Sequence, residues 1–285
     1  MDPEPEAVLV SCGLIVAGLM TFVWLLSLVL QRVSIVDGFW GPGFALIAVY
    51  SRWHGASSGV TDARTVLALM TVLWGCRLGA HLGVRLISER TEDRRYQAMR
   101  VRHGPGFAVT SLWIVFWLQG AVMWLVALPL QTALPRSEPP WSVAGCYAAG
   151  LLWATGLFFE AVGDWQLMRF RSRRQNGSDV LRTGLWALTR HPNYFGDFLV
   201  WWGLWLFCVN LGSPWWTIIS PLVMSAFLIR FSGAGLLERD IADRRPDYAA
   251  YVASTNAFFP GWPRARRTQS AARHPTDAPP GNPPP

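Results

Sequence analysis

The chain has 285 residues, of which 52% are hydrophobic and only 15% are charged, and it contains 17 tryptophans. This composition argues against an ordinary soluble domain and predicts an all-α integral membrane protein. The formal net charge of +7 would suit a nucleic-acid partner, but membrane topology accounts for it, so we expect none.

Arginine supplies every basic side chain, because the sequence contains no lysine among its 25 basic residues. A Schiff-base lysine and a P-loop lysine are therefore excluded. Codon usage in a GC-rich bacterial genome and a need for phosphate-binding guanidinium groups both explain the bias. Four cysteines lie in apolar segments without zinc spacing, so we expect small core residues and no metal site. They are Cys12, Cys76, Cys146 and Cys208.

Apolar runs recur along the whole chain and predict a bundle of about seven transmembrane helices, since one crossing needs about 20 apolar residues. The runs are residues 7–30, 43–53, 65–87, 107–130, 141–159, 194–209 and 214–231. The run at 43–53 is short and fits a re-entrant segment as well as a span. Residues 1–6 are acidic, so the first run is expected to be a retained span and not a cleaved signal peptide.

The placement of the arginines predicts the orientation. The strongly basic segments are residues 90–102, residues 169–190 and the chain after 231, whereas the loops that intervene between them carry only Arg52, Arg64 and Arg136. The positive-inside rule puts the basic segments and the C-terminus in the cytoplasm and the N-terminus outside, in a bacterial inner membrane. We expect one membrane domain over residues 1–263 and a disordered, proline-rich tail over 264–285.

After the first span, glycines and a proline interrupt the helix and place Asp37 among aromatic residues near membrane depth. Asp37 is either the N-cap of the next short helix or an acid that faces a cavity and donates a proton. Further along, Gln119 lies in the middle of a span, where a hydrogen bond to another helix is expected.

Arg77, His81 and Arg85 follow one another at intervals of four residues, which places them on one face of a helix. Because such a stripe is intolerable against lipid, it faces either carboxylates of a neighbouring helix or the phosphate of a ligand. The loop at 89–102 is charged and is expected to be a solvated face, with Tyr96 as a candidate stacking or proton-donating residue.

Glu160 and Asp164 lie four residues apart at the inner end of a span, and Arg171 follows on the same face. Two neighbouring carboxylates need cations or hydroxyl donors, which arginines of another helix or the sugar of a nucleotide would supply. The arginines that follow, Arg169, Arg171, Arg173 and Arg174, are also explained by the positive-inside rule alone, which requires no ligand.

Residues 184–206 begin with a basic turn that contains Pro192 and continue into a tryptophan-rich segment with one acid, Asp197. Polar groups gathered at the end of a span predict a functional site. The polar residues of this turn are Arg190, His191, Asn193 and Tyr194, and those after the last span are Glu238, Arg239, Arg244, Arg245, Tyr248 and Tyr251. We expect the tyrosines to lie on an amphipathic interfacial helix.

Five motifs carry a resemblance to the bacterial DUF1295 branch of the steroid 5-alpha-reductase-like membrane proteins. They are SIVDGFWG, WGCRLGAHLGVR, FEAVGDWQL, GLWALTRHPNYFGDFLVWWG and GLLERDIADRRPDYAAYVASTNAFFP. The RHPNYFG motif and the late Glu-Arg-Tyr pattern are also similar to the isoprenylcysteine carboxyl methyltransferases. The resemblance implies that residues 141–263 hold a dinucleotide on the cytoplasmic side, and that the N-terminal half holds a lipid-accessible substrate cavity.

By this resemblance, Asp164, Arg171 and Asn193 match cofactor-binding positions of the reductases. Asp197 replaces a glutamate at another such position, and Glu160 stands where the reductases have asparagine.

Arg85 matches a cofactor-side arginine one turn beyond a His-Tyr pair, which here reads His81-Leu82. The tyrosine that polarises a steroid carbonyl is therefore missing. Either His81 or Tyr96 replaces it as the acid, or the substrate is not such a steroid. Asp37 is expected to take the place of a catalytic glutamate.

We therefore expect an NADPH-dependent reductase of a carbon-carbon double bond, whose partners are the lipid bilayer and a lipophilic small-molecule substrate. The predicted catalytic residues are Asp37, His81 and Tyr96. The predicted cofactor-binding residues are Arg85, Glu160, Asp164, Arg171, Arg190, His191, Asn193, Tyr194, Asp197, Glu238, Arg239 and Tyr248. An S-adenosylmethionine-dependent methyltransferase of a lipid or lipidated substrate and a non-catalytic lipid-binding membrane protein are the alternatives.

Overall fold

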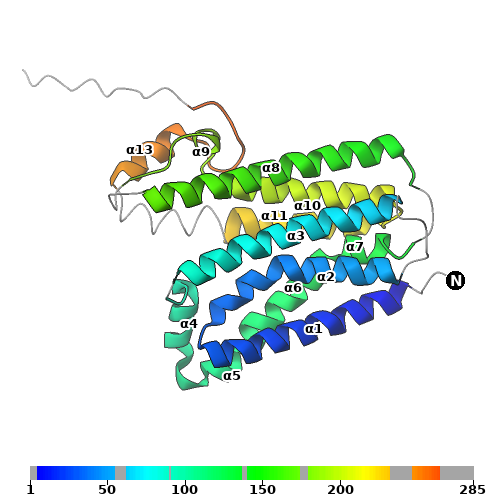
Figure 1. Ribbon diagram of the computed structural model, residues 1–285, viewed down its shortest axis with the longest axis horizontal. Coiled ribbons are helices and arrows are strands. Elements are labelled where there is room, and N and C mark those ends of the chain that lie inside the picture. Colours follow the sequence, from blue (N-terminus) through cyan, green and yellow to red (C-terminus); the bar gives the residue numbers. More distant parts are fainter. Residues whose placement is uncertain are drawn as a thin grey trace, which may run out of the picture.

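A computed structural model describes residues 5–54, 62–89, 91–136, 140–173, 179–231 and 246–263, and over these residues the chain is helical without strands (Figure 1). The first half contains α1 (Pro5–Leu30), η1 (Val33–Phe39), α2 (Trp40–Trp53), α3 (Ala63–Ser88), α4 (Arg94–His103), η2 (Gly104–Gly106), α5 (Phe107–Ser111), η3 (Leu112–Trp117), α6 (Leu118–Val126) and α7 (Leu128–Ala133). The second half contains α8 (Val143–Arg173), α9 (Leu185–Leu188), α10 (Pro192–Asn210), η4 (Trp215–Ile218), α11 (Ile219–Ala226), η5 (Phe227–Phe231) and α13 (Pro246–Ser254).

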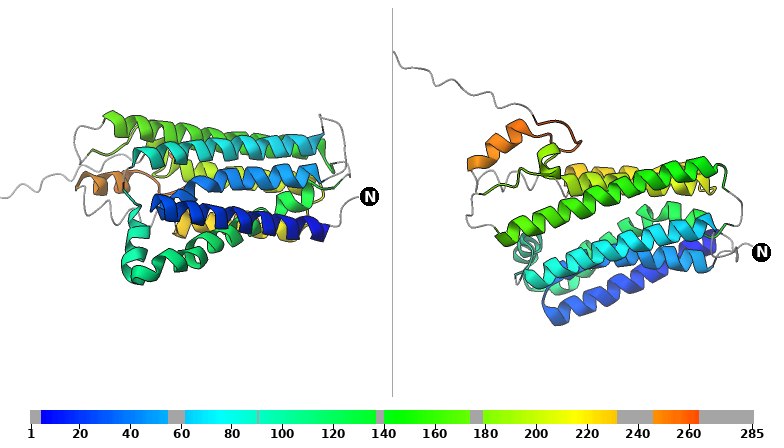
Figure 2. Two further views of the ribbon diagram at one scale, coloured as in Figure 1. Left: turned by 60° about the horizontal axis from the view of Figure 1, so that its bottom comes forward. Right: turned by 45° about the horizontal axis from the view of Figure 1, so that its top comes forward.

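The long helices run side by side along one axis, and Figure 2 shows the same arrangement from two further directions. The short elements α4, α9 and α13 gather at one end of this bundle. The described parts of two segments expected to be strongly basic, at 94–102 and at 169–173 with 179–190, therefore share one end, as the arginine pattern predicts. Which side of the membrane this end faces stays a prediction.

Five helical segments within the described ranges are long and apolar enough to cross a membrane: Glu6–Leu30, Val33–Trp53, Ala63–Ser88, Arg94–Val126 and Val143–Arg173. They support an integral membrane protein. A shorter apolar helix, Trp215–Ile229, and the 19-residue α10 add apolar segments outside this set. The predicted total of seven spans is therefore not established by length and composition.

The second span differs from the prediction because it starts earlier than residue 43. The backbone N–H of Trp40 donates to the Asp37 carbonyl, so η1 continues directly into α2. The joined segment has 21 residues, which is long enough to cross the hydrocarbon core. The N-cap of α2 is Phe39, so the predicted capping role of Asp37 is wrong.

Glycines set the distance between α8 and α10. A Cβ added to Gly196 would lie 2.6 Å from the Gly156 carbonyl oxygen, and one added to Gly203 would lie 2.7 Å from the Trp153 nitrogen. Both distances are far below van der Waals contact, so only hydrogen fits at these positions. Small residues allow membrane helices to approach closely, and here they bring Glu160 of α8 against the first turns of α10.

Aromatic rings fill the space where α2, α3 and α10 meet. The Trp201 ring centroid lies 4.6 Å from that of Phe44 and 5.3 Å from that of Trp74, both in edge-to-face geometry. Three of the four cysteines are buried as predicted, but Cys76 is exposed, because it lies on the outer face of α3.

Candidate functional site

The stripe on α3 meets the carboxylates of α8, which is one of the two roles predicted for it. Arg77 donates through Nη1 to the Glu160 carboxylate and through Nη2 to the Asp164 carboxylate. Its Nη2 also donates to the Glu160 carbonyl oxygen at 3.1 Å. Four-residue spacing on both helices makes this double ion pair possible, because each helix presents its polar groups on one face.

One more helix, α10, contributes to the same cluster, and α3 contributes two further side chains. Trp74 Nε1 of α3 donates to Glu160 Oε2 at 2.9 Å, and Asn193 Nδ2 of α10 donates to Asp164 Oδ1 at 3.0 Å. His81 Nε2 lies 3.6 Å from Asp164 Oδ2. The two carboxylates are 3% and 4% exposed, so they depend on these partners for their solvation.

Asp197 completes this group, which we call the acidic cluster: Glu160, Asp164 and Asp197 with Arg77 and Asn193. Asp197 lies one helical turn beyond Asn193, and its negative charge acts on Glu160. The Asp197 carboxylate is buried, and the indole N–H of Trp201, one turn further along, is a donor that faces it. These two groups therefore satisfy one another in part, and Asp197 belongs to the polar interior of the bundle.

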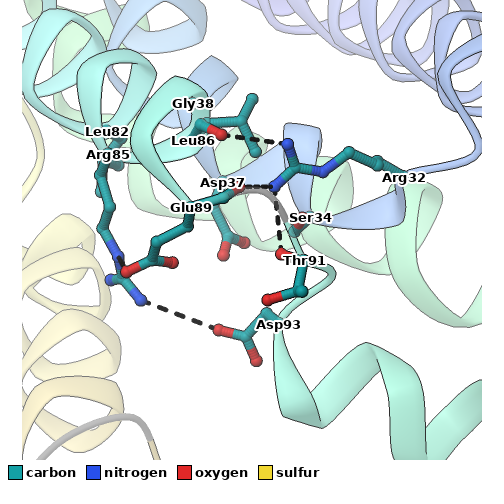
Figure 3. A pocket seen from close by; sticks show the side chains of 10 residues that line it. All are labelled: Arg32, Ser34, Asp37, Gly38, Leu82, Arg85, Leu86, Glu89, Thr91 and Asp93. Carbon is teal, nitrogen blue, oxygen red and sulfur yellow. Dashed lines mark hydrogen bonds and ion pairs between the residues drawn. The ribbon is translucent and has the colours of Figure 1, made fainter.

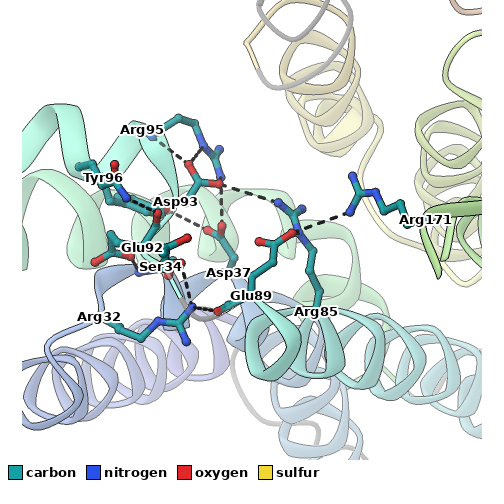
Figure 4. Close-up of polar contacts among 12 residues, drawn as sticks. Arg32, Ser34, Asp37, Arg85, Glu89, Glu92, Asp93, Arg95, Tyr96 and Arg171 are labelled. Atoms are coloured by element: carbon teal, nitrogen blue, oxygen red, sulfur yellow. Dashed lines mark hydrogen bonds and ion pairs between the residues drawn. The ribbon is translucent and has the colours of Figure 1, made fainter. Parts of the chain in front are cut away.

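A second polar centre surrounds Asp37 in the N-terminal half (Figure 4). The Tyr96 hydroxyl donates to Asp37 Oδ1 at 2.8 Å, and Arg95 Nη2 donates to Oδ2 at 3.0 Å. Gln119 Nε2 donates to the Tyr96 oxygen at 3.1 Å, and Trp40 Nε1 donates to Gln119 Oε1 at 2.5 Å. Every donor in this chain is oriented toward Asp37, so the chain holds the Asp37 side chain in one orientation.

These contacts confirm the interhelical hydrogen bond expected of Gln119. The solvated face expected at 89–102 is wrong for Tyr96, which is only 4% exposed. It is also wrong for Glu92, whose carboxylate accepts from the backbone nitrogens of Val33 at 2.7 Å and Ser34 at 2.9 Å. Most of the other described residues at 91–102 are exposed, as expected of a solvated face, and the exceptions are the side chains that fold back onto η1.

Asp37 lies at the wall of a pocket between η1, the C-terminal end of α3 and the loop before α4 (Figure 3). The pocket is lined by Arg32, Ser34, Asp37, Gly38, Leu82, Arg85, Leu86, Glu89, Thr91 and Asp93. Arg85 Nε donates to Glu89 Oε1 at 3.0 Å, and Arg85 Nη2 lies 4.0 Å from Asp93 Oδ2. The third member of the α3 stripe therefore faces this pocket, whereas the first faces the acidic cluster.

Asp93 is ionised in this loop. Burial raises the pKa of Asp93, but hydrogen bonds from the side chain and backbone of Arg95 outweigh that effect and lower it below its usual value. Its contacts with Arg95 and Arg85 are therefore ion pairs at neutral pH.

Arg171, which the spacing places on the same face of α8 as Asp164, reaches the Glu89 carboxylate at the pocket. Its Nη1 is 3.8 Å from Glu89 Oε1, and its side chain is 54% exposed (Figure 4). This contact links the C-terminal end of α8 to the wall of the pocket.

The basic turn before α10 is held mainly by the C-terminal segment. Arg190 Nη1 donates to the carbonyl oxygens of Val252 at 3.1 Å and Thr255 at 2.8 Å, at the end of α13. Thr189 Oγ1 donates to the Phe258 carbonyl at 2.8 Å. The His191 ring stacks on Tyr194, with centroids 5.5 Å apart and planes 6° apart. This segment fixes the direction in which α10 starts.

Tyr248 and Tyr251 are both buried, so they do not form the interfacial belt expected of them. The Tyr251 hydroxyl donates to the Trp186 carbonyl at 2.6 Å, and the Tyr248 ring lies against it. Glu238 and Arg239 lie outside the described residues. The sequence reasoning did not single out Trp74, Arg95 and Thr189, because an indole, a loop arginine and a turn threonine carry no spacing signal of their own.

The Tyr96 contacts predict a measurable loss of stability. In Tyr96→Phe the buried Nε2 of Gln119 loses its acceptor, which costs about 1–3 kcal/mol. We expect a lower melting temperature in detergent, whereas Tyr147→Phe, on the exposed face of α8, should melt like the unmodified protein. Equal melting of all three proteins would show that the chain from Trp40 to Asp37 does not form.

A family model described as "Protein of unknown function (DUF1295)" matches residues 23–255. No curated protein and no solved structure gives a significant match to the chain.

Proposed function

We propose that this chain, which belongs to the DUF1295 family, is a membrane-embedded reductase that uses NADPH to reduce a carbon-carbon double bond of a lipid-soluble substrate. One observation supports this most directly. A single face of α3 joins a buried acidic cluster at Arg77 to a pocket at Arg85 whose wall includes Asp37. The first centre suits a nucleotide, and the second suits the delivery of a proton.

The acidic cluster fits the polar part of a nucleotide. Its three carboxylates are hydrogen-bond acceptors, and ribose hydroxyls and a carboxamide are donors that suit them. Asn193 and Arg77 hold Asp164 in place from two sides, so its orientation is fixed before any ligand arrives. NADPH would supply the hydride when bound.

Two arginines are placed to meet phosphates. Arg171 is more than half exposed and lies near Arg85, because both contact the Glu89 carboxylate. A guanidinium group can donate two parallel hydrogen bonds to the oxygens of a phosphate. A phosphate would therefore compete with the Glu89 carboxylate for Arg85 and Arg171. Arg190 is less suited to this role, since its Nη1 is committed to carbonyl groups of α13 and of the residue that follows it.

Reduction of a double bond also needs a proton on the second carbon. Asp37 is the group that reaches the pocket, whereas Tyr96 is buried behind it and donates to it. We therefore assign the proton transfer to Asp37 and the orientation of its carboxylate to Tyr96 and Arg95. His81 lies beside Asp164 and is the other candidate donor.

The methyltransferase is the second candidate, and the acidic cluster favours it as well. Three carboxylates near one arginine suit the sulfonium cation of S-adenosylmethionine. The residues that would support this reading most, Glu238 and Arg239, lie outside the described ranges.

Ligand-induced stabilisation separates the candidates. Purified protein in lipid nanodiscs should melt at a higher temperature with NADPH than without it, because a ligand that binds only the folded state stabilises that state. Asn193→Ala should abolish the shift, and Thr155→Ala, on the exposed side of α8, should keep it. A shift with S-adenosylmethionine alone would support the methyltransferase, and no shift with either would support a non-catalytic lipid-binding protein.

The substrate can be sought independently. Deleting the gene in its host should cause one unsaturated lipid to accumulate, and comparing the lipids of the deletion strain with those of its parent would identify it.

A further inference from the structure

The hydrogen bonds that lead to Asp37 form a network with a single direction. Trp40 Nε1 donates to Gln119 Oε1 at 2.5 Å, and Gln119 Nε2 donates to the Tyr96 oxygen at 3.1 Å. The Tyr96 hydroxyl in turn donates to Asp37 Oδ1 at 2.8 Å. The network therefore leaves the first residue of α2, passes through α6 and α4, and returns to η1 three positions before it began.

Trp40 sets this direction because an indole can donate a hydrogen bond but cannot accept one. A side-chain amide has an acceptor end and a donor end, and turning the Gln119 amide around would bring two donors face to face at Trp40. The Gln119 oxygen must therefore face Trp40, and its NH₂ group must face Tyr96.

The orientation of the Gln119 amide decides where the Tyr96 hydrogen goes. A hydroxyl has one hydrogen and can donate to one partner. Because Gln119 presents a donor to Tyr96, the hydrogen is left for Asp37. Tyr96 is 4% exposed, so water offers it little alternative. With the amide reversed, Tyr96 could donate to either neighbour, and its bond to Asp37 would not be fixed.

The second oxygen of Asp37 is held by another group that only donates. Arg95 Nη2 donates to Oδ2 at 3.0 Å, and a guanidinium has no acceptor (Figure 4). While the network keeps its direction, neither Tyr96 nor Arg95 accepts a hydrogen bond from Asp37. Asp37 also lines the pocket, so a proton on Asp37 is passed on toward the pocket and not back into the protein.

We propose that Trp40 is a positioning residue for Asp37: by fixing the Gln119 amide, it commits the Tyr96 hydroxyl to Asp37 and directs the proton of Asp37 into the pocket. This inference rests on the proposed function, in which Asp37 protonates the substrate. In that step the O–H bond of Asp37 breaks, its proton forms a C–H bond with the π electrons of the double bond, and a carboxylate remains. The other carbon of the double bond takes hydride from NADPH.

The titration of Asp37 tests the role of Trp40 without cofactor or substrate. NMR of protein in nanodiscs, labelled with ¹³C at the aspartate carboxyl groups, follows this titration, and the signal lost in Asp37→Asn identifies Asp37. Trp40→Phe frees the Gln119 amide to turn its oxygen to Tyr96 and compete with Asp37 for the hydroxyl. We expect the titration midpoint to move by about half a pH unit or more, in the direction that Tyr96→Phe moves it, because a neutral hydrogen bond is worth roughly that much.

A second substitution should reverse the effect. In the double variant Trp40→Phe, Gln119→Met no amide competes for Tyr96, so the midpoint should return to that of the unmodified protein. A benzothiophene analogue of tryptophan at position 40, which lacks only the N–H, should give the same shift as Trp40→Phe and replaces that variant if it does not fold. Arg95, Asp93 and Arg85 are charged side chains that act on Asp37, and these variants change none of them.

Trp24→Phe is the matched control. It removes another indole hydrogen bond, to the Ala108 carbonyl oxygen at 2.9 Å, and should lower the melting temperature without moving the Asp37 midpoint. An unchanged midpoint in Trp40→Phe, an equal shift in Trp24→Phe, or a double variant that titrates like Trp40→Phe would each overturn the role of Trp40.

These outcomes are separate from those of the proposed function, because the titration contains no dinucleotide. A failed titration overturns the positioning role while stabilisation by NADPH still supports the reductase. A protein that titrates as expected but is not stabilised by NADPH would support the positioning of Asp37 by Trp40 and overturn the reductase.

Discussion

Gly196→Ala should prevent normal assembly of the C-terminal half. The added methyl group would lie 2.6 Å from the Gly156 carbonyl oxygen and would also overlap the backbone nitrogen of Glu160. Backbone atoms of a helix cannot move aside as a flexible side chain can, so α8 and α10 would have to separate. Overpacking of a tight core costs about 1–3 kcal/mol, and a clash with backbone lies at or above the upper end of that range. We expect a large fall in melting temperature and in the yield of monodisperse protein.

Gly150→Ala provides the matched control for this experiment. Gly150 lies on the same helix α8, and nothing is within 4 Å of the position its Cβ would take. Alanine favours a helix over glycine by about 1 kcal/mol, so this variant should be as stable as the unmodified protein or slightly more so. If both variants melt alike, α8 and α10 do not approach as closely as the structure indicates.

Helical spacing was sufficient to predict which polar residues share a face of α3 and which share a face of α8. Arg77, His81 and Arg85 share a face of α3, and Glu160 and Asp164 share a face of α8, because four residues make about one turn. Spacing could not choose between a phosphate and a neighbouring carboxylate as the partner of Arg77. That choice depends on how closely α3, α8 and α10 pack, which is a property of the whole bundle.

The Asp37 centre was harder to predict for a different reason. Tyr96 is separated from Asp37 by 59 positions along the chain and belongs to a stretch rich in charge, which resembles a solvated loop. The stretch folds back because the Glu92 carboxylate accepts hydrogen bonds from the first backbone nitrogens of η1. A side chain that accepts hydrogen bonds from backbone groups far away in the sequence produces no periodic pattern of residue types. The sequence therefore gives no signal for this contact.

The basic turn before α10 shows that residue type alone does not identify a ligand. Arg190 has the chemistry of a phosphate-binding residue, yet it donates to carbonyl groups about 60 positions further along the chain, at 252 and 255. Those carbonyls belong to the end of a helix, where orphan acceptors attract basic side chains. The sequence indicated correctly that the turn is important, but its partner became apparent only in three dimensions.

Arg77→Met should be among the most destabilising single substitutions in the chain. Its two partners are almost fully buried, and removing the arginine leaves Glu160 and Asp164 close together without a cation between them. Breaking a buried ion pair by removing one partner costs about 3–5 kcal/mol, mainly because the remaining charge is left uncompensated. We expect a strongly lowered melting temperature, measured in detergent and in nanodiscs.

Removing the stranded charges should reverse much of this loss. The triple variant Arg77→Met, Glu160→Gln, Asp164→Asn keeps the shape of the cluster but contains no uncompensated ion pair, so it should melt well above Arg77→Met alone. Arg173→Met removes the same charge from the exposed last turn of α8 and should change stability by no more than about 0.5 kcal/mol. If the triple variant is no more stable than Arg77→Met, the arginine acts through the packing of its aliphatic chain and not through its charge, because neutralising the carboxylates would then have no effect.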